Sequence, residues 1–349
     1  MNFWKKIKKP IFVIAPMANV TDFAFRTMFA KYGKPDVMWT EFVSADGLCS
    51  PEGREKLLND LKFSPKERPI VAQLFTGHPD KMREAAKLVA ELGFDGLDIN
   101  MGCPDRSVER QGGGSAMIRS PKIALEVLEA AREGWKEAKE NFTDLPISIK
   151  TRIGYNSVDW RWLRLLLEQN LPVLTVHLRT RKEMSDVPAH WSLMTEIVKL
   201  RDEVQVNIPA KDRTLIIGNG DVTSLADAKE KVKKYGCDGV MIGRGIFGKP
   251  WFFSQLKSHS KKESKNTTEK TPEERLKIML EHAKLFDKLY CKKGNSKEAK
   301  NSHKNFAVMK KHFKAYVSGW DGAKELRVQL MEVNTYKEVE KIVKGYLAR

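Results

Sequence analysis

The sequence has no long hydrophobic run. Within its 349 residues, no stretch approaches the roughly 20 consecutive apolar residues that a membrane-spanning helix needs. Residues 1–17 carry a basic patch and then an apolar run, as a signal peptide does. Pro10 and Pro16 interrupt the run, however, and no small-residue cleavage site follows it. We therefore predict an N-terminal strand at this position and no contact with a membrane.

Cysteine is scarce, and its positions exclude two common classes of small domain. Cys49, Cys103, Cys237 and Cys291 lie far apart and form no CxxC pair. This spacing indicates neither a disulfide framework nor a zinc site. We expect a protein of the reducing cytoplasm that binds no metal.

Acidic residues are fewer than basic residues, and the formal net charge is +17. Such an excess favours a polyanionic partner and says nothing about the fold. The excess is concentrated near the C-terminus, where residues 288–314 contain nine lysines against the single acidic residue Glu298. A run of this kind is either a nucleic-acid contact or simply a solvated helix face.

Short β-branched, apolar runs recur between amphipathic stretches. The eight runs are residues 11–17, 37–43, 70–75, 96–102, 146–153, 173–179, 214–220 and 239–245. Strands that alternate with helices pair in parallel, and eight such units in about 250 residues predict an α/β fold, a (β/α)8 TIM barrel. An open doubly wound sheet is the alternative, but the GxGxxG turn expected after its first strand is missing.

Polar residues stand at the C-terminal ends of these predicted strands. They include Glu41, Gln73, Asn100, Lys150 and His177. In a barrel these ends converge on the face that carries catalysis. Glycine-rich turns follow the seventh strand (218–221) and the eighth (243–245), where barrels often hold a phosphate on backbone N–H groups.

The chain changes character after Trp251. Residues 258–271 are polar and aperiodic and predict a linker. Thr271 and Pro272 then form a helix start, with Glu274 at the third helical position. We predict a barrel over 1–257 and a basic bundle of three or four helices over 272–349.

The stretch 96–118 is the strongest candidate for an active site. A buried strand containing Asp98 ends at Asn100-Met101-Gly102-Cys103-Pro104 and continues into the glycine triplet 112–114. A thiol between a strand and a flexible loop is typical of an active-site floor and lid. Cys103 as a small buried hydrophobe is the alternative.

The remaining strand ends suit a phosphorylated planar cofactor. Lys150 could neutralise charge on a reduced ring, Gln73 could hydrogen-bond a ring edge, and the backbone of 15–18 could lie along one face. This environment is typical of flavin mononucleotide (FMN). For Lys150, an ion pair inside the barrel with Asp98 or Glu41 is an equal alternative.

Several motifs together resemble one enzyme family. They are PMANVTDFAFR (16–26), TEFVSADGL (40–48), QLFTGHPDKMREAA (73–86), GLDINMGCPDRSVERQGGGSAMI (96–118), IKTRIG (149–154), HLRT (177–180), GNGDVTS (218–224) and GCDGVMIGRGIFGKPWFF (236–253). In this order they resemble the tRNA-dihydrouridine synthases. Residues 303–319 resemble the helical RNA-binding domain of that family.

The resemblance implies a role for each matching residue. Cys103 would be the catalytic acid, and Asn100 and Arg179 would contact the target base. FMN would contact Pro16, Met17, Ala18, Gln73, Lys150, His177, Asn219, Gly220, Asp221, Gly243 and Arg244. RNA would contact Lys304, Lys310, Lys311 and Lys314. The implied reaction is an oxidoreduction at a CH–CH bond, in which NADPH reduces the flavin and a uridine of tRNA becomes dihydrouridine. We expect a cytoplasmic monomer.

The chain departs from the family in the loop after HLRT, where it has Glu183, Ser185, Val187 and Ala189-His190-Trp191. It also has Leu178 in place of a small residue and Asn19 in place of a glycine. Since that loop is expected to touch the substrate, the modified uridine and the kind of RNA stay open. Two rival interpretations are a small-molecule flavin oxidoreductase related to dihydroorotate dehydrogenases, and a non-catalytic RNA-binding protein.

Overall fold

The computed structural model describes residues 2–139, 145–256, 269–291 and 304–348. They divide into two compact units, one of residues 1–18 and 36–245 and one of residues 19–35 and 246–349. Residues 19–35 and 246–256, which the sequence analysis places in the barrel, thus group with the C-terminal helices. The predicted linker at 258–271 lies mostly outside the described residues.

The first unit is built on eight parallel strands. They are β1 (Ile11–Ile14), β2 (Met38–Ser44), β3 (Ile70–Phe75), β4 (Gly96–Met101), β5 (Ile147–Arg152), β6 (Val173–His177), β7 (Leu215–Asn219) and β8 (Gly239–Ile242). They pair in the order β1-β8-β7-β6-β5-β4-β3-β2, and a single parallel bridge between Val13 and Val37 joins the two ends of this sheet. All eight predicted strands and the predicted barrel class are confirmed.

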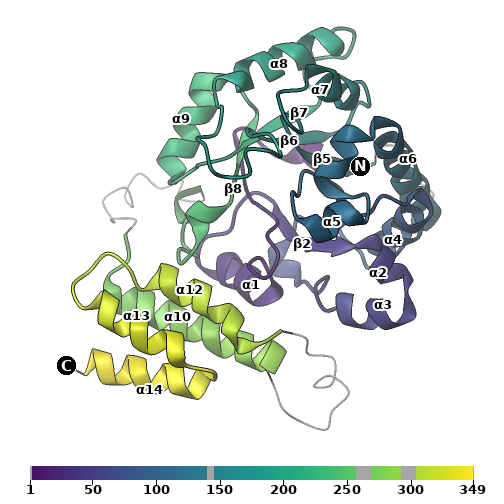
Figure 1. Cartoon of the computed structure of the whole chain (residues 1–349). Helices are drawn as coiled ribbons and strands as arrows, with labels where there is room; N and C mark the ends of the chain where they lie inside the picture. The colour runs from purple at the N-terminus through teal and green to yellow at the C-terminus, as the bar shows by residue number, and fades with distance from the viewer. Residues whose placement is uncertain (1, 140–144, 257–268, 292–303, 349) are drawn as a thin grey trace. The chain divides into compact units, whose positions relative to one another are not determined.

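Helices cover the outside of the strands (Figure 1). The helices of this unit are α2 (Ala45–Cys49), α3 (Pro51–Leu57), α4 (Pro79–Glu91), α5 (Arg106–Arg110), α6 (Pro121–Ala138), α7 (Trp160–Leu167), α8 (Leu193–Val204) and α9 (Leu225–Tyr235). Their apolar sides face the strands, as in α6, where Val127, Leu128 and Trp135 are buried. This one-sided burial is the amphipathic pattern that the sequence shows.

The barrel interior changes from apolar to polar along the strands. Its apolar part is a cluster that includes Ile11, Val13, Trp39, Val71, Val173, Ile217 and Met241. The N-terminal segment adds Trp4, which is 2% exposed and whose ring centroid lies 5.7 Å from that of Trp39. Because alternate residues of a strand point to the same side, the positions two and four further along carry the polar groups, for example Gln73 after Val71.

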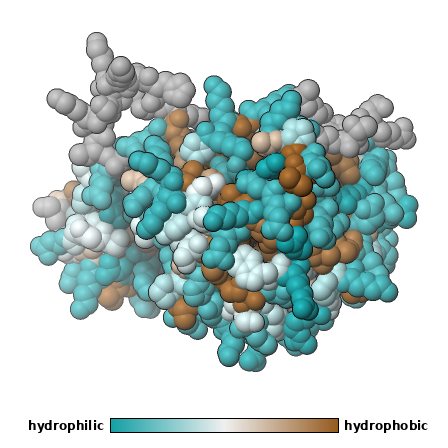
Figure 2. All heavy atoms as spheres, turned by 90° about the horizontal axis from the view of Figure 1, so that it is seen from above, coloured by the Kyte–Doolittle hydropathy of each residue, from teal (hydrophilic) through white to brown (hydrophobic). Residues whose placement is uncertain are grey.

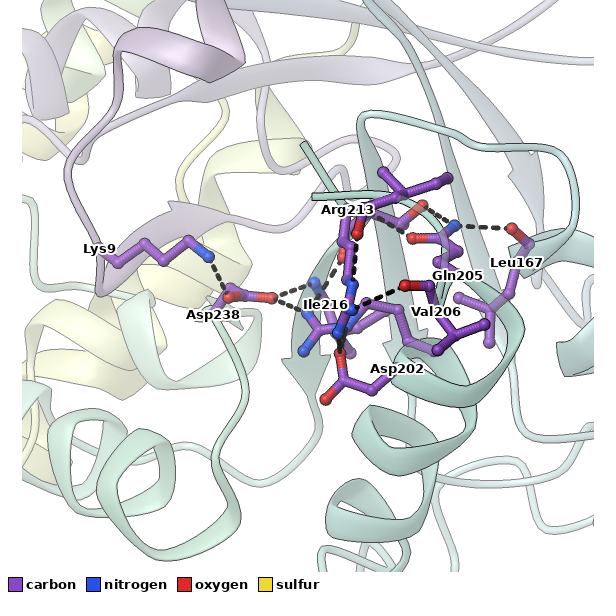
Figure 3. Close-up of polar contacts among 11 residues, drawn as sticks. Lys9, Leu167, Asp202, Gln205, Val206, Arg213, Ile216 and Asp238 are labelled. Carbon is purple, nitrogen blue, oxygen red and sulfur yellow. Dashed lines mark hydrogen bonds and ion pairs between the residues drawn. The ribbon is translucent and has the colours of Figure 1, made fainter. Parts of the chain in front are cut away.

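The closed end of the barrel, where the strands begin, is held by a polar network (Figure 3). Asp238, just before β8, accepts hydrogen bonds from Lys9 Nζ at 2.6 Å and from Arg201 at 2.8 Å. Its second oxygen also accepts from the backbone N–H of Ile216 at 2.8 Å. Beside it, Arg213 donates to Asp202 at 2.9 Å. The buried carboxylate of Asp238 therefore has its charge matched within the fold.

The second unit is helical. It contains α1 (Phe23–Tyr32), α10 (Pro272–Phe286), α12 (Met309–Tyr316), α13 (Ala323–Glu332) and α14 (Tyr336–Leu347), and the predicted helical tail is confirmed. Thr271 caps α10 in a capping box with Glu274, as the sequence predicts. α1 joins this unit through Lys31, whose ammonium lies 2.6 Å from Glu281 of α10.

The surface is mainly hydrophilic. Figure 2 shows hydrophilic residues over most of one face, with hydrophobic residues gathered in a few patches. Among the described helices, none has both the length and the apolar content that a membrane span requires. Nor do the described residues contain a group of three or more His, Cys, Asp and Glu side chains placed to hold a metal ion.

Candidate active site

The polar strand ends predicted from sequence lie side by side at the open end of the barrel. Strand pairing places Asn100 of β4 beside Lys150 of β5, and Arg152 of β5 beside His177 of β6. His177 in turn pairs with Asn219 of β7. Parallel strands without a break in register therefore bring together groups that are more than 100 positions apart in the sequence.

These strand ends surround a cavity of about 240 Å³. Its lining residues are Ala15, Pro16, Met17, Lys150, His177, Arg179, Ser185, Asn219, Gly220, Asp221, Val222, Gly243, Arg244 and Gly245. The lining includes most of the predicted cofactor contacts, but not Ala18 or Gln73. Arg179, predicted to contact substrate, lies in this cavity as well. A larger hollow of about 480 Å³ lies between α7 and α8, away from the strand ends.

The cavity is positively charged. Lys150, Arg179 and Arg244 line it, with Asp221 as the carboxylate of the lining. Arg179 donates to one oxygen of Asp221 at 2.5 Å and Arg244 to the other at 3.1 Å. One carboxylate thus serves two guanidinium groups, and Lys150 adds a third positive charge. An anionic ligand would complete this balance.

The Lys150 ammonium makes no ion pair with Asp98 or Glu41 in the part of the chain that the structure describes. Burial, and then the charge of Arg152, lower its pKa to about 8. Burial and the charges of Lys150 and Arg152 likewise hold the pKa of His177 well below its usual range. At neutral pH the site therefore contains an unpaired ammonium next to a neutral imidazole.

The turn after β7 has the backbone form of an anion cradle. Gly220 has φ 131° and Asp221 has φ 49°, and successive turn residues of this kind can point N–H groups into one concavity. A Cβ at Gly220 would lie 2.7 Å from the Cβ of Ala189, whereas a Cβ at Gly243 would meet nothing closer than 3.8 Å. The open space at Gly243, the cradle and the cations fit a phosphorylated, planar, anionic cofactor.

Cys103 follows β4 and is held by Asn100. The Asn100 side-chain oxygen accepts hydrogen bonds from the backbone N–H of Cys103 at 2.9 Å and of Gly102 at 3.1 Å. Burial raises the pKa of the Cys103 thiol above its ordinary value, so that the thiol keeps its proton at neutral pH. Lys150 and Cys103 are close enough for each to influence the pKa of the other.

The glycine triplet 112–114 is closely packed against its neighbours. Gly113 and Gly114 are buried, and a Cβ at Gly114 would lie 2.5 Å from the Cys103 carbonyl oxygen. That carbonyl also accepts from the backbone N–H of Ser115 at 2.9 Å. Gly114 is needed for close packing against Cys103, because a side chain there would push the Cys103 loop away.

Arg152 fastens the two loops that border the site, a role that the motif did not reveal. Its guanidinium donates to the carbonyl of Gly102 at 2.8 Å, to that of Thr180 at 2.8 Å and to that of Met184 at 2.9 Å. A second link joins Arg181 to Glu109 at 2.5 Å. The sequence feature that could have indicated this role is the position of Arg152, a charged residue at the end of an apolar strand.

The loop that departs from the family pattern has its own hydrogen bonds. Glu183 accepts from the backbone N–H of Thr180 at 2.7 Å and lies 2.8 Å from His190. Ala189 donates its backbone N–H to Asp221 at 2.8 Å. Asn19, which stands where the family has a glycine, has φ 55°, a conformation that asparagine tolerates better than most residues.

The predicted RNA contacts lie in the helical unit, but not all on its surface. Lys311 and Lys314 of α12 are exposed. Lys310 is half-buried and lies on the same side of the helix as the buried Phe313, three positions further on. Lys304 is 7% exposed and lies 5.4 Å from the centroid of the Tyr290 ring. The lysines at 292–303 lie outside the described residues.

The remaining cysteines are not part of this site. Cys49, Cys237 and Cys291 are free thiols, and burial raises the pKa of each to about 11. A raised pKa leaves little thiolate at neutral pH, so these thiols react slowly. The prediction that Cys103 alone carries chemistry therefore rests on its place after β4.

Fold and site define a parallel (β/α)8 barrel with a cationic cavity and a thiol at its open end. A model of the dihydrouridine synthase (Dus) family matches residues 13–348, and the chain belongs to that family. A probable tRNA-dihydrouridine synthase of Staphylococcus aureus is 39% identical over 350 residues, which cover all of this chain and 96% of the relative. The probable tRNA-dihydrouridine synthase 2 of Bacillus subtilis is 41% identical, over 99% of this chain and 96% of its own.

Among solved structures, morphinone reductase shares 13% sequence identity with a TM-score of 0.49, over 72% of this chain and 87% of its own.

Proposed function

We propose that this protein is a tRNA-dihydrouridine synthase that uses FMN and takes its electrons from NADPH. The proposal depends on the position of Cys103 and Asn100 at the end of β4, directly beside the strand that bears Lys150. Family membership supports the assignment. The chain would work in the cytoplasm as a monomer.

The cavity residues suit the cofactor by charge and shape. Arg244, near the turns after β7 and β8, would bind its phosphate, with the backbone of Gly220 and Gly243 close to it. Lys150 would face the ring, where its unpaired ammonium stabilises negative charge. When bound and reduced, the flavin supplies the hydride that adds to C6 of the uracil ring.

The residues of the chain complete the reduction. Asn100 would hydrogen-bond the target base and hold the Cys103 loop in place. Cys103 would donate its thiol proton to C5, so that the C5–C6 double bond becomes a single bond. The resulting thiolate then takes a proton from solvent. A protonated thiol is needed for this step, and the raised pKa of Cys103 provides it.

RNA binding would involve the exposed lysines of α12. Lys311 and Lys314 are one helical turn apart on the side of α12 that faces away from the buried Phe313. Lysines on one face of a helix can contact successive phosphates. The target uridine must leave its base stack to reach a site inside a barrel.

The test is Cys103→Ala, with Cys49→Ala as the matched control. The readouts are dihydrouridine formed in unmodified tRNA, measured by mass spectrometry, and NADPH-driven bleaching of the flavin. We expect Cys103→Ala to keep the bleaching and to reduce tRNA about 100- to 10,000-fold more slowly, the usual contribution of a general acid. Equal tRNA reduction by Cys103→Ala and wild type would overturn the assignment.

A further inference from the structure

Two polar side chains lie fully buried behind the site, and neither lines the cofactor cavity. Gln73 of β3 and Asp98 of β4 are each 0% exposed and are opposite one another in the strand pairing. Burying a carboxylate is costly unless its lone pairs are matched by donors. Each oxygen of the Asp98 carboxylate has such a donor.

The carboxylate of Asp98 sets the orientation of the Gln73 amide. One Asp98 oxygen accepts from the hydroxyl of Ser148 at 2.5 Å and the other from Gln73 Nε2 at 2.6 Å. An ionised carboxylate can only accept hydrogen bonds. The NH₂ group of Gln73 must therefore point toward Asp98, and its Oε1 must point the other way.

From Gln73 the chain of hydrogen bonds reaches Cys103. Gln73 Oε1 accepts from Asn100 Nδ2 at 3.0 Å, which turns the Asn100 oxygen toward the backbone N–H groups of Gly102 and Cys103. Both ends of the relay demand the same orientation, since the carboxylate only accepts and the backbone N–H groups only donate. The relay leaves one N–H of Asn100 for a ligand.

We propose that Asp98 is a positioning residue that acts through Gln73 to fix Asn100 and, with it, the Cys103 loop. This inference rests on the proposed function, and it names the residue that orients the base-contacting amide and the proton donor. Asp98 lies opposite Ser148 of β5, two positions before Lys150, and is not part of the cavity lining, so it acts without touching the substrate.

The orientation of the relay does not depend on the charge of Asp98. Burial raises the pKa of Asp98 to about 6, against the lowering effects of Gln73, Ser148, Lys150 and Trp39. Lys150 of β5 is the charged group among them, and Trp39 faces the carboxylate from β2. Once Asp98 takes up a proton, its hydroxyl can donate to Ser148 while its other oxygen still accepts from Gln73. The relay therefore persists as pH falls through about 6.

Asp98→Leu and Asp98→Asn separate orientation from charge. Leucine removes the acceptor, so the Gln73 amide can turn over. Asparagine keeps it, because its oxygen can accept from Gln73 while its NH₂ donates to Ser148. Ser148→Ala is the matched control, since it removes the other hydrogen bond of the same carboxylate and leaves the relay intact.

The first readout needs neither RNA nor cofactor. Iodoacetamide labelling of Cys103 is followed by mass spectrometry, with Cys49, Cys237 and Cys291 as internal references. We expect Asp98→Leu to alkylate faster than wild type at Cys103 alone, because its loop is no longer held, and Asp98→Asn and Ser148→Ala to match wild type. Unchanged labelling of Cys103 in a folded Asp98→Leu would overturn the proposal.

The second readout is tRNA reduction. In Asp98→Leu we expect kcat to fall on the order of 100-fold, as misplacement of reacting groups by about 1 Å does, while flavin bleaching by NADPH is unchanged. Asp98→Asn should keep the wild-type rate. If Asp98→Leu does not fold, Gln73→Leu breaks the relay at its middle, and wild-type labelling of Cys103 in that variant refutes the proposal. Should tRNA reduction fail for every variant, the labelling still decides the role of Asp98.

Discussion

The two ends of the barrel satisfy their charges in different ways. At the closed end, Asp238 is matched by Lys9, by Arg201 and by a backbone N–H, all within 2.8 Å (Figure 3). At the open end, Asp221 is shared by two arginines, and Lys150 has no hydrogen-bond or ion-pair partner within the described ranges.

This difference separates a stabilising network from a binding site. A charge that is fully matched within the fold contributes to stability and has nothing left for a ligand. An unmatched buried cation destabilises the fold, and it is kept where it serves a ligand. The difference predicts that substitutions at the closed end change the free energy of unfolding, whereas substitutions at the open end change catalysis.

The largest effect is expected at the closed end, for Asp238→Ala. Removing this carboxylate takes from Arg201, whose side chain is 11% exposed, the more buried of its two acidic partners, and leaves the Ile216 N–H without its acceptor. Breaking a buried ion pair in this way costs about 3–5 kcal/mol. Urea unfolding should show this loss, with tRNA reduction per folded molecule unchanged.

Glu203→Ala is the control for that substitution. Glu203 pairs with Arg164 at 2.8 Å, but its side chain is 67% exposed. An exposed pair contributes about 0–1 kcal/mol. If Asp238→Ala and Glu203→Ala had equal effects on the free energy of unfolding, the closed end would not be the stabilising network that its geometry indicates.

The next largest effect is expected when lysine is replaced by methionine at each end of the barrel, in Lys150→Met at the open end and in Lys9→Met at the closed end. Lys150→Met should slow tRNA reduction on the order of 100- to 1,000-fold, as the loss of a preorganised charge does, and should leave the free energy of unfolding unchanged or higher. Lys9→Met should do the reverse, with activity retained and a small loss of stability, since Lys9 is half-exposed. Loss of stability without loss of activity in Lys150→Met would contradict the comparison.

The open end could largely be predicted from the sequence, and the reason is strand order. Lys150, His177 and Asn219 end consecutive strands, so the barrel alone brings them together. The same rule predicted the turns after β7 and β8. Residues that line a cavity through their strand position are thus visible in sequence once the fold is known.

Other features depend on side-chain geometry and could not be predicted. Gln73 is fully buried and bonded to Asp98 and Asn100, an arrangement that its residue type does not indicate. The charge pattern does not show that Lys304 packs against Tyr290, because burial of one lysine depends on the fold of its neighbours. Arg152 anchors two loops through three backbone carbonyl groups. Every residue has such a carbonyl, so the sequence does not show which ones Arg152 bonds.

A smaller effect should appear in RNA affinity, which we expect to be independent of the open-end cations. The double variant Lys311→Glu/Lys314→Glu should weaken tRNA binding and lower the slope of log affinity against log salt by about 2, one for each lost phosphate contact. Lys324→Glu/Lys337→Glu, at two other exposed positions of the helical unit, is the charge-matched control. A salt slope that is equal in both double variants would place the RNA elsewhere.

The smallest effect is the pH dependence of the open end. In the folded chain the pKa of Lys150 is lowered from 10.5 to about 8, so between these values the unfolded chain binds more protons. The free energy of unfolding therefore rises with pH in this window, because the cost of the buried ammonium is present below pH 8 and is relieved above it. From pH 7 to 9 wild type should gain about 1 kcal/mol relative to Lys150→Met, as urea unfolding at each pH would show.

Over the same range tRNA reduction by wild type should decline, because the ammonium that serves the anionic cofactor is lost. A difference between wild type and Lys150→Met that does not change with pH would mean that Lys150 is already matched within the fold, and the contrast between the two ends of the barrel would then be lost.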